Sequence, residues 1–118
     1  SICAEMDELA KGEATLSAEI LDDFKQQQGF AHGGLVFALA DSAAGYAALT
    51  MMPLHTEVMT AELKINYLAA GQGKLIAKGR VLKTGKRLIV VAADVWAEHE
   101  NFRKHIAAVQ GTMVPVAS

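Results

Sequence analysis

Gly33 and Gly34 come directly before an apolar run, Leu35 to Met52, in which Asp41 is the one carboxylate. Glycines at the start of a helix leave backbone N–H groups accessible at the positive end of the helix dipole. Because an ionised carboxylate is costly to desolvate, we expect a buried Asp41 to be compensated by a partner or used for chemistry. Together these residues suit acyl chemistry, in which amide donors polarise a carbonyl and an acid attacks it or activates water. Each also has a plainer interpretation: a tight turn for the glycines and a solvated or paired acid.

The spacing of Gly34 and Asp41 limits how they could act together. Seven residues separate them, which in a helix places both on one face but about 10 Å apart along the axis. One carbonyl group cannot contact both within a single chain. Two such helices running antiparallel across a two-fold axis would bring Gly33 or Gly34 of one copy beside Asp41 of the other. If the site is catalytic, the geometry therefore predicts a homodimer with two composite sites.

Hydrophobic periodicity predicts the elements that position these residues. A long helix, apolar all round, is predicted over residues 33–50, and it must end before Pro53. Strict alternation over residues 59–68 predicts a half-buried strand in which Thr60 shares a side with Glu62 and Lys64. Five strands are predicted: residues 14–20, 59–68, 74–83, 88–96 and 102–114. Residues 21–30 are predicted to form a loop or helical turn. A short helix is predicted around Ile2, Met6 and Leu9, with Gly12 as its cap.

Short turns between the later strands imply an antiparallel meander. Five strands and one long helix suggest an α+β fold in which an antiparallel five-stranded sheet wraps around that helix. At 118 residues the chain is expected to form a single domain, residues 1–118.

Composition limits the possible partners and compartment. The net charge of −2 argues against generic binding to nucleic acid or to an anionic membrane, and the apolar run is too short to span a bilayer. Cys3 is the only cysteine, and the first residues do not have the pattern of a signal peptide, so we expect a reducing compartment, the cytoplasm. No metal is expected, because His55, His99 and His105 lack ligand spacing with cysteines or acids.

The segment Gly29-Phe30-Ala31-His32-Gly33-Gly34, followed by Leu39-Ala40-Asp41, resembles the signature of hotdog-fold acyl-CoA thioesterases, specifically the phenylacetate-pathway (PaaI-type) group. The resemblance covers most of residues 13–114, and its most specific part is the spacing from the glycines to the acid. It implies a hotdog sheet, a homodimer often paired into a homotetramer, and hydrolysis of an acyl-CoA thioester. It implies no cofactor.

The resemblance also implies roles for single residues. Gly33 corresponds to the residue whose backbone N–H binds the thioester oxygen, and Asp41 to the nucleophile or general base. Thr60 falls where the family often has a serine or threonine that helps to place water, although threonine is also common in strands for propensity alone. Gln26 lies where many relatives have an asparagine, so this chain departs from the pattern there. His32 is either a base or, more often at such a position, a residue that fixes the loop.

Four cations, Arg80, Lys83, Lys86 and Arg87, gather around one predicted hairpin with no acid between them. They suit the phosphates of the CoA nucleotide, because arginine and lysine form charge-assisted hydrogen bonds with phosphate. A solvated turn is the plainer interpretation.

Two other functions stay open at this point. One is a hotdog hydratase or dehydratase acting on enoyl or hydroxyacyl thioesters, with His32 and Asp41 as an acid–base pair, although the chain lacks the histidine motifs of those families. The other is a module that binds acyl-CoA without turnover.

Overall fold

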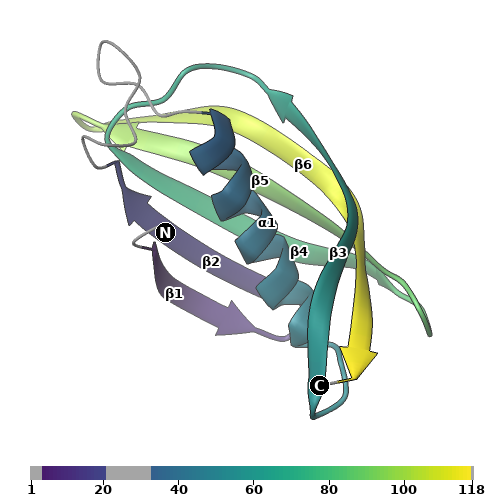
Figure 1. Cartoon of the computed structure of the whole chain (residues 1–118). Helices are drawn as coiled ribbons and strands as arrows, with labels where there is room; N and C mark the ends of the chain where they lie inside the picture. The colour runs from purple at the N-terminus through teal and green to yellow at the C-terminus, as the bar shows by residue number, and fades with distance from the viewer. Residues whose placement is uncertain (1–3, 21–32, 118) are drawn as a thin grey trace.

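The computed structural model describes residues 4–20 and 33–117. One helix and six strands make up this part of the chain, and Figure 1 follows them from the N-terminus to the C-terminus. The elements are β1 (Ala4–Ala10), β2 (Glu13–Glu19), α1 (Gly33–Leu49), β3 (Thr56–Tyr67), β4 (Lys74–Thr84), β5 (Ile89–His99) and β6 (Phe102–Ala117).

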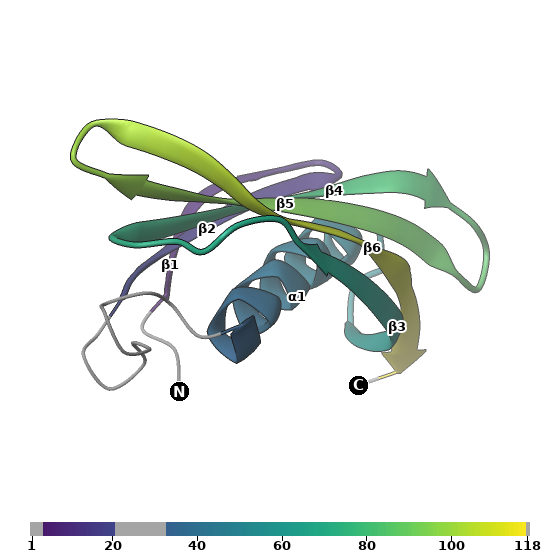
Figure 2. The ribbon, with the colours of Figure 1, turned by 90° about the horizontal axis from the view of Figure 1, so that it is seen from above.

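The strands form one antiparallel sheet in the order β1-β2-β4-β5-β6-β3. The sheet curves around α1, which lies against one side of it, and no described element covers the other side (Figure 2). This arrangement of one helix on a curved antiparallel sheet is the predicted α+β hotdog architecture, with six strands instead of five.

Small residues allow α1 to lie directly on the sheet. Ala40, Ala43, Ala44 and Ala47 of the helix are fully buried. A Cβ atom added at Gly79 of β4 would collide with the backbone carbonyl of Ala43, so only glycine permits this close approach. At this contact the core depends on the short distance between helix and sheet, while larger buried side chains such as Leu39, Leu75 and Ile106 fill the space around it.

The helix is apolar on nearly every side, as its composition predicts, but it is not buried on every side. Its side away from the sheet carries an open stripe that includes Gly34 and Ser42, both exposed, with Ala38 and Asp41 partly exposed between them. These four residues recur at helical spacing and thus lie on one face. We call this face the open stripe of α1.

The prediction of a short N-terminal helix is wrong. Residues 4–10 form the edge strand β1, which pairs with β2 through a turn at Lys11 and Gly12. Gly12 adopts a φ of 77°, which suits a tight hairpin turn, and its N–H donates a hydrogen bond of 2.7 Å to Thr50 Oγ1 at the end of the helix. Ile2 lies outside the described residues. Two or three apolar positions at helical spacing are too few to distinguish a helix from an exposed strand.

The predicted meander holds for β4, β5 and β6 only. β3 pairs with β6, at the opposite edge of the sheet from β1, and is not a neighbour of β4. The connection from β3 to β4 therefore crosses between non-adjacent strands.

Candidate active site

Asp41 and Thr60 are in direct contact. The Thr60 hydroxyl lies 2.7 Å from Asp41 Oδ1 and 3.2 Å from the sulfur of Met113. A hydroxyl has one proton to donate, and the carboxylate is the stronger acceptor, so the proton belongs in the bond to Asp41. Among the described residues, the other carboxylate oxygen of Asp41 accepts no hydrogen bond. The Thr60 hydroxyl thus holds one oxygen of the carboxylate in place.

A β-bulge in β3 places Thr60 beside the helix. Thr60 is paired with Met113 and Glu62 with Thr112, so Ala61 is an extra residue with no partner on β6. Such a residue reverses the alternation of the strand. Thr60 therefore shares a side with Val58 and Leu63 and faces α1, while the carboxylate of Glu62 accepts a hydrogen bond from Thr112 on the opposite side.

The prediction that Thr60 shares a side with Glu62 and Lys64 is accordingly wrong. That prediction assumed that side chains alternate between the two sides of β3 along its whole length, and the bulge at Ala61 interrupts this alternation. Thr60 is exposed, and its hydroxyl lies beside the carboxylate of Asp41.

The helix begins at Gly33, as predicted, and Gly34 is exposed. A Cβ atom added at Gly34 would meet no other described residue within 4 Å. The first N–H groups of a helix have no partner within it and mark the positive end of its dipole. Gly34 and Asp41 belong to one uninterrupted helix, about two turns apart. Within one chain, a single substrate carbonyl therefore cannot contact both the Gly34 N–H and the Asp41 carboxylate.

Tyr67, at the end of β3, contacts the start of the helix. Its hydroxyl donates a hydrogen bond of 2.8 Å to the backbone carbonyl of Gly33. In the sequence, the alternation over residues 59–68 groups Tyr67 with the apolar residues of its strand and indicates no function for it. Its phenol, at an otherwise apolar position, was the signal that could have identified it.

Two residues of the predicted site, Gln26 and His32, lie outside the described residues. The structure neither supports nor opposes the roles that the resemblance implies for them.

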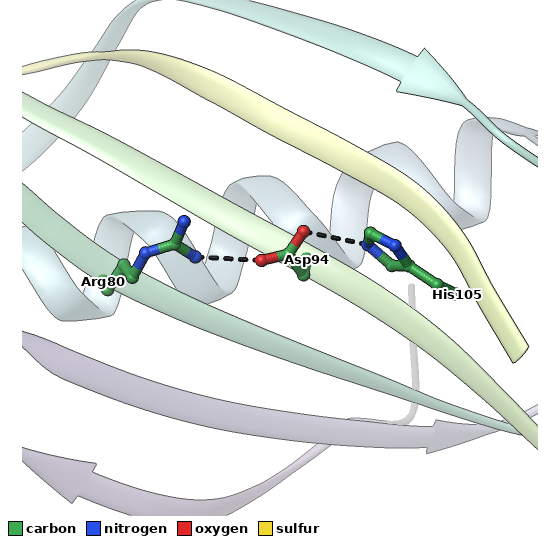
Figure 3. Close-up of polar contacts among 3 residues, drawn as sticks. All are labelled: Arg80, Asp94 and His105. Carbon is green, nitrogen blue, oxygen red and sulfur yellow. Dashed lines mark hydrogen bonds and ion pairs between the residues drawn. The ribbon is translucent and has the colours of Figure 1, made fainter. Parts of the chain in front are cut away.

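The four predicted phosphate-binding cations are divided between two environments. Lys86 and Arg87 lie in the turn between β4 and β5, with Lys83 close to the end of β4. Arg80 instead lies on the side of the sheet opposite the helix, where its guanidinium forms an ion pair of 2.9 Å with Asp94 (Figure 3). The prediction overlooked this acid because Asp94 is distant in sequence and becomes a neighbour only through strand pairing.

Asp94 organises a polar cluster on this outer face of the sheet. Its second oxygen lies 2.9 Å from His105 Nε2 (Figure 3). The His105 ring stacks on Trp96, with 5.3 Å between ring centroids, and the guanidinium of Arg103 lies 4.8 Å from the Trp96 ring centroid. Asp94 is the one carboxylate in the apolar run 88–96, so it carried the same sequence signal as Asp41. The cluster is separated from Asp41 by the thickness of the sheet.

Two further observations concern residues 4–20 and 33–117 only. Within them, no group of three or more His, Cys, Asp or Glu side chains is placed to hold a metal ion. In the same ranges, α1 does not reach the length and hydropathy of a helix that spans a membrane.

Comparison with known proteins gives consistent matches. The family model of the thioesterase superfamily matches residues 28–102. A thioesterase family protein from Silicibacter pomeroyi superposes with a TM-score of 0.94 and is 31% identical, over 99% of this chain and 87% of that one. A protein from Streptococcus mutans, solved bound to acetyl-CoA, gives a TM-score of 0.83 at 27% identity, over 98% of this chain and 90% of that one.

Relatives found by sequence similarity point to the same class of hydrolase. The chain is 36% identical over 98 residues to a protein of Saccharolobus solfataricus named "putative esterase", a match that covers 82% of this chain. The chain spans 65% of that relative's length. With a family model matching more than half of the chain, and with the hotdog architecture present, this chain belongs to the thioesterase superfamily.

Proposed function

We propose that this protein hydrolyses acyl-CoA thioesters to a free acid and CoA, as a member of the PaaI-type group. The observation that carries the proposal is the hydrogen bond between Thr60 and Asp41, on the helix whose open N-terminus begins at Gly33. This bond orients a partly exposed carboxylate on the open stripe of α1. The thioesterase family match supports the same class of reaction.

The roles follow from the chemistry of the two groups. Backbone N–H groups at Gly33 and Gly34 donate to the thioester oxygen and stabilise the negative charge that develops on it. Asp41 either attacks the carbonyl carbon, expelling the CoA thiolate and forming an anhydride that water then hydrolyses, or removes a proton from the attacking water. Thr60 keeps the carboxylate oriented and is suited to hydrogen-bond that water. His32 and Gln26 belong to this proposal as the neighbouring loop residues.

A homodimer completes the site in this proposal. Because Gly34 and Asp41 are about two turns apart on one helix, the donors and the acid at one carbonyl come from different copies. The open stripe of α1 is available to face the partner's helix. β3 is also the last strand at its edge of the sheet, so among the described elements nothing pairs with its other side. Association of two such dimers into a tetramer is a further part of the proposal.

The CoA part of the substrate is assigned to the cations beyond the end of the helix. Lys83 lines a hollow with Lys11, from the β1–β2 turn, and with Met51, which follows the helix; Arg80 and the acid Glu13 line it as well. Lys86 and Arg87 extend this positive region along the β4–β5 turn. Arginine and lysine bind phosphate through charge-assisted hydrogen bonds. The acetyl-CoA bound to the Streptococcus mutans relative supports a CoA thioester as the ligand class. Arg80 contributes least, because Asp94 already neutralises it.

The experiment measures thiol release from a panel of acyl-CoA thioesters by wild type and by Asp41→Asn. We expect the substitution to lower kcat by about a thousandfold, within the range for loss of general acid–base catalysis. Asp7→Asn, the same change at an exposed carboxylate of β1, at the edge of the sheet opposite β3, is the matched control and should keep kcat within a factor of two. Full activity of Asp41→Asn would overturn the site assignment.

The same panel separates the other candidate activities. Loss of enoyl absorbance without thiol release would identify a hydratase, and binding of CoA esters with no turnover would identify a binding module. A wild type that hydrolyses an acyl thioester of N-acetylcysteamine as well as the acyl-CoA would argue against recognition of the nucleotide.

A further inference from the structure

Tyr67 lies at the candidate site but has no role in the chemistry proposed above. It belongs to the helix-facing side of β3, and 54% of the residue is exposed. Its hydroxyl donates its single proton to the carbonyl oxygen of Gly33, at 2.8 Å. That proton is therefore committed to the backbone and is not available to a substrate while the bond is made.

The Gly33 carbonyl is one end of a peptide group that ends in the Gly34 N–H. Because a peptide group is planar, a contact that holds its carbonyl also orients its N–H. A hydrogen bond accepted by the carbonyl polarises the whole group and strengthens the N–H as a donor. The Gly34 N–H is one of the first N–H groups of α1, which have no partner within the helix.

Glycine at position 33 is what allows the tyrosine ring to come this close. A Cβ atom added at Gly33 would lie 3.2 to 3.3 Å from three atoms of the Tyr67 side chain. Glycine has no Cβ to restrict its backbone, so a contact beyond the hydrogen bonds of the helix itself adds to the forces that keep this peptide in one orientation. Tyr67 supplies that contact from the neighbouring strand.

A single strand thus contacts both parts of the candidate machinery. Thr60 of β3 bonds the carboxylate of Asp41, and Tyr67, seven residues later, bonds the peptide at the helix start. Both bonds are made on the side of β3 that faces α1. The bulge at Ala61 is required for this, because without it the two residues would lie on opposite sides of the strand.

We propose that Tyr67 is a positioning residue for the oxyanion donors: through the Gly33 carbonyl it orients and polarises the peptide that presents the Gly34 N–H to the thioester oxygen. This inference rests on the proposed thioesterase function. It adds that the strength of the Gly34 N–H as a hydrogen-bond donor depends on Tyr67, a side chain of β3.

Tyr67→Phe tests the proposal, because it removes the hydroxyl and keeps the ring. We expect kcat for acyl-CoA hydrolysis to fall about tenfold, less than for outright loss of an oxyanion donor, while KM changes by less than twofold. In ¹H–¹⁵N spectra, the Gly34 amide resonance should move and its exchange with solvent should become faster. Tyr46→Phe removes the hydroxyl of the other tyrosine, which is 45% exposed, and should leave both readouts unchanged.

The possible outcomes separate this proposal from the proposed function. If wild type hydrolyses thioesters and Asp41→Asn does not, a Tyr67→Phe enzyme with kcat within twofold of wild type would overturn the role of Tyr67 alone. A loss of kcat with no change at the Gly34 amide would overturn it as well. If wild type hydrolyses no thioester, the proposed function fails. In that case the Gly34 amide resonance still tests Tyr67: if it does not move in Tyr67→Phe, Tyr67 does not orient or polarise the Gly33–Gly34 peptide.

Discussion

On one side of α1, Ala40, Ala43, Ala44 and Ala47 are fully buried against the sheet, whereas on the other side Gly34 and Ser42 are exposed. Small residues occur on both sides, but for different reasons. Against the sheet they let two backbones approach, as the lack of space at Gly79 demonstrates. On the open stripe, the space around Gly34 shows that no other described residue packs against this part of the helix tip.

This difference indicates how one short helix can serve both the core and a site. The buried side has no freedom to change, because every atom there has a close neighbour. The open side keeps a carboxylate partly exposed, held by Thr60 and not by burial. Stability and the proposed chemistry therefore depend on opposite faces of one element, and substitutions on each face should separate them.

The largest loss of stability is expected from Gly79→Ala. The added methyl group would collide with the Ala43 carbonyl, so helix and strand would have to move apart. Overpacking of this kind costs about 3 kcal/mol, to be measured as the free energy of unfolding in urea. A free energy of unfolding equal to that of wild type would mean that α1 does not lie this close to β4.

Ala38→Arg should weaken association of the dimer without lowering the stability of the single protomer. Ala38 lies between Gly34 and Asp41 on the open stripe, so antiparallel helices would place it near the two-fold axis. Two unpaired arginines there should weaken the dimer by about a hundredfold, since burying an uncompensated charge costs a few kcal/mol. Light scattering coupled to size-exclusion chromatography would detect the monomer, and its activity should be lost while its melting temperature stays near that of wild type. A fully active dimer would contradict a composite site.

Gly34→Ala should have the smallest effect on folding and is the matched counterpart of Gly79→Ala. Its Cβ would meet no other described residue within 4 Å, so we expect the free energy of unfolding to change by less than about 1 kcal/mol. If the open stripe faces substrate or partner, the same methyl group should lower kcat/KM about tenfold, the cost of mild overpacking. Unchanged kcat/KM would indicate that the space beside Gly34 stays empty during turnover.

Much of the fold was predictable because its elements have strong local patterns. The helix from Gly33 and the strands after it were predicted within a few residues, since each has a long periodic run bounded by turn residues. β1 was missed because it is short and exposed along its whole length, so it has no buried face to create a pattern. Pairing of β3 with β6 was missed because strand order depends on contacts between distant segments.

The candidate site was predicted in part for similar reasons. Gly33, Gly34 and Asp41 stand out in the sequence because they interrupt an apolar run. The contact between Thr60 and Asp41 was not predictable from spacing, because a bulge at Ala61 follows from pairing with β6. Arg80 was grouped with three other cations by sequence, and the sheet placed Asp94 beside it.

The sequence by itself determined where the helix begins, that its tip is glycine, and that an acid follows on the same face, because helical geometry depends only on neighbouring residues. The tertiary structure decided which strand lies beside that acid and which side chains reach it. Thr60 and Tyr67 come to the helix only after β3 has paired with β6 in one register, and that register is chosen by packing across the whole sheet.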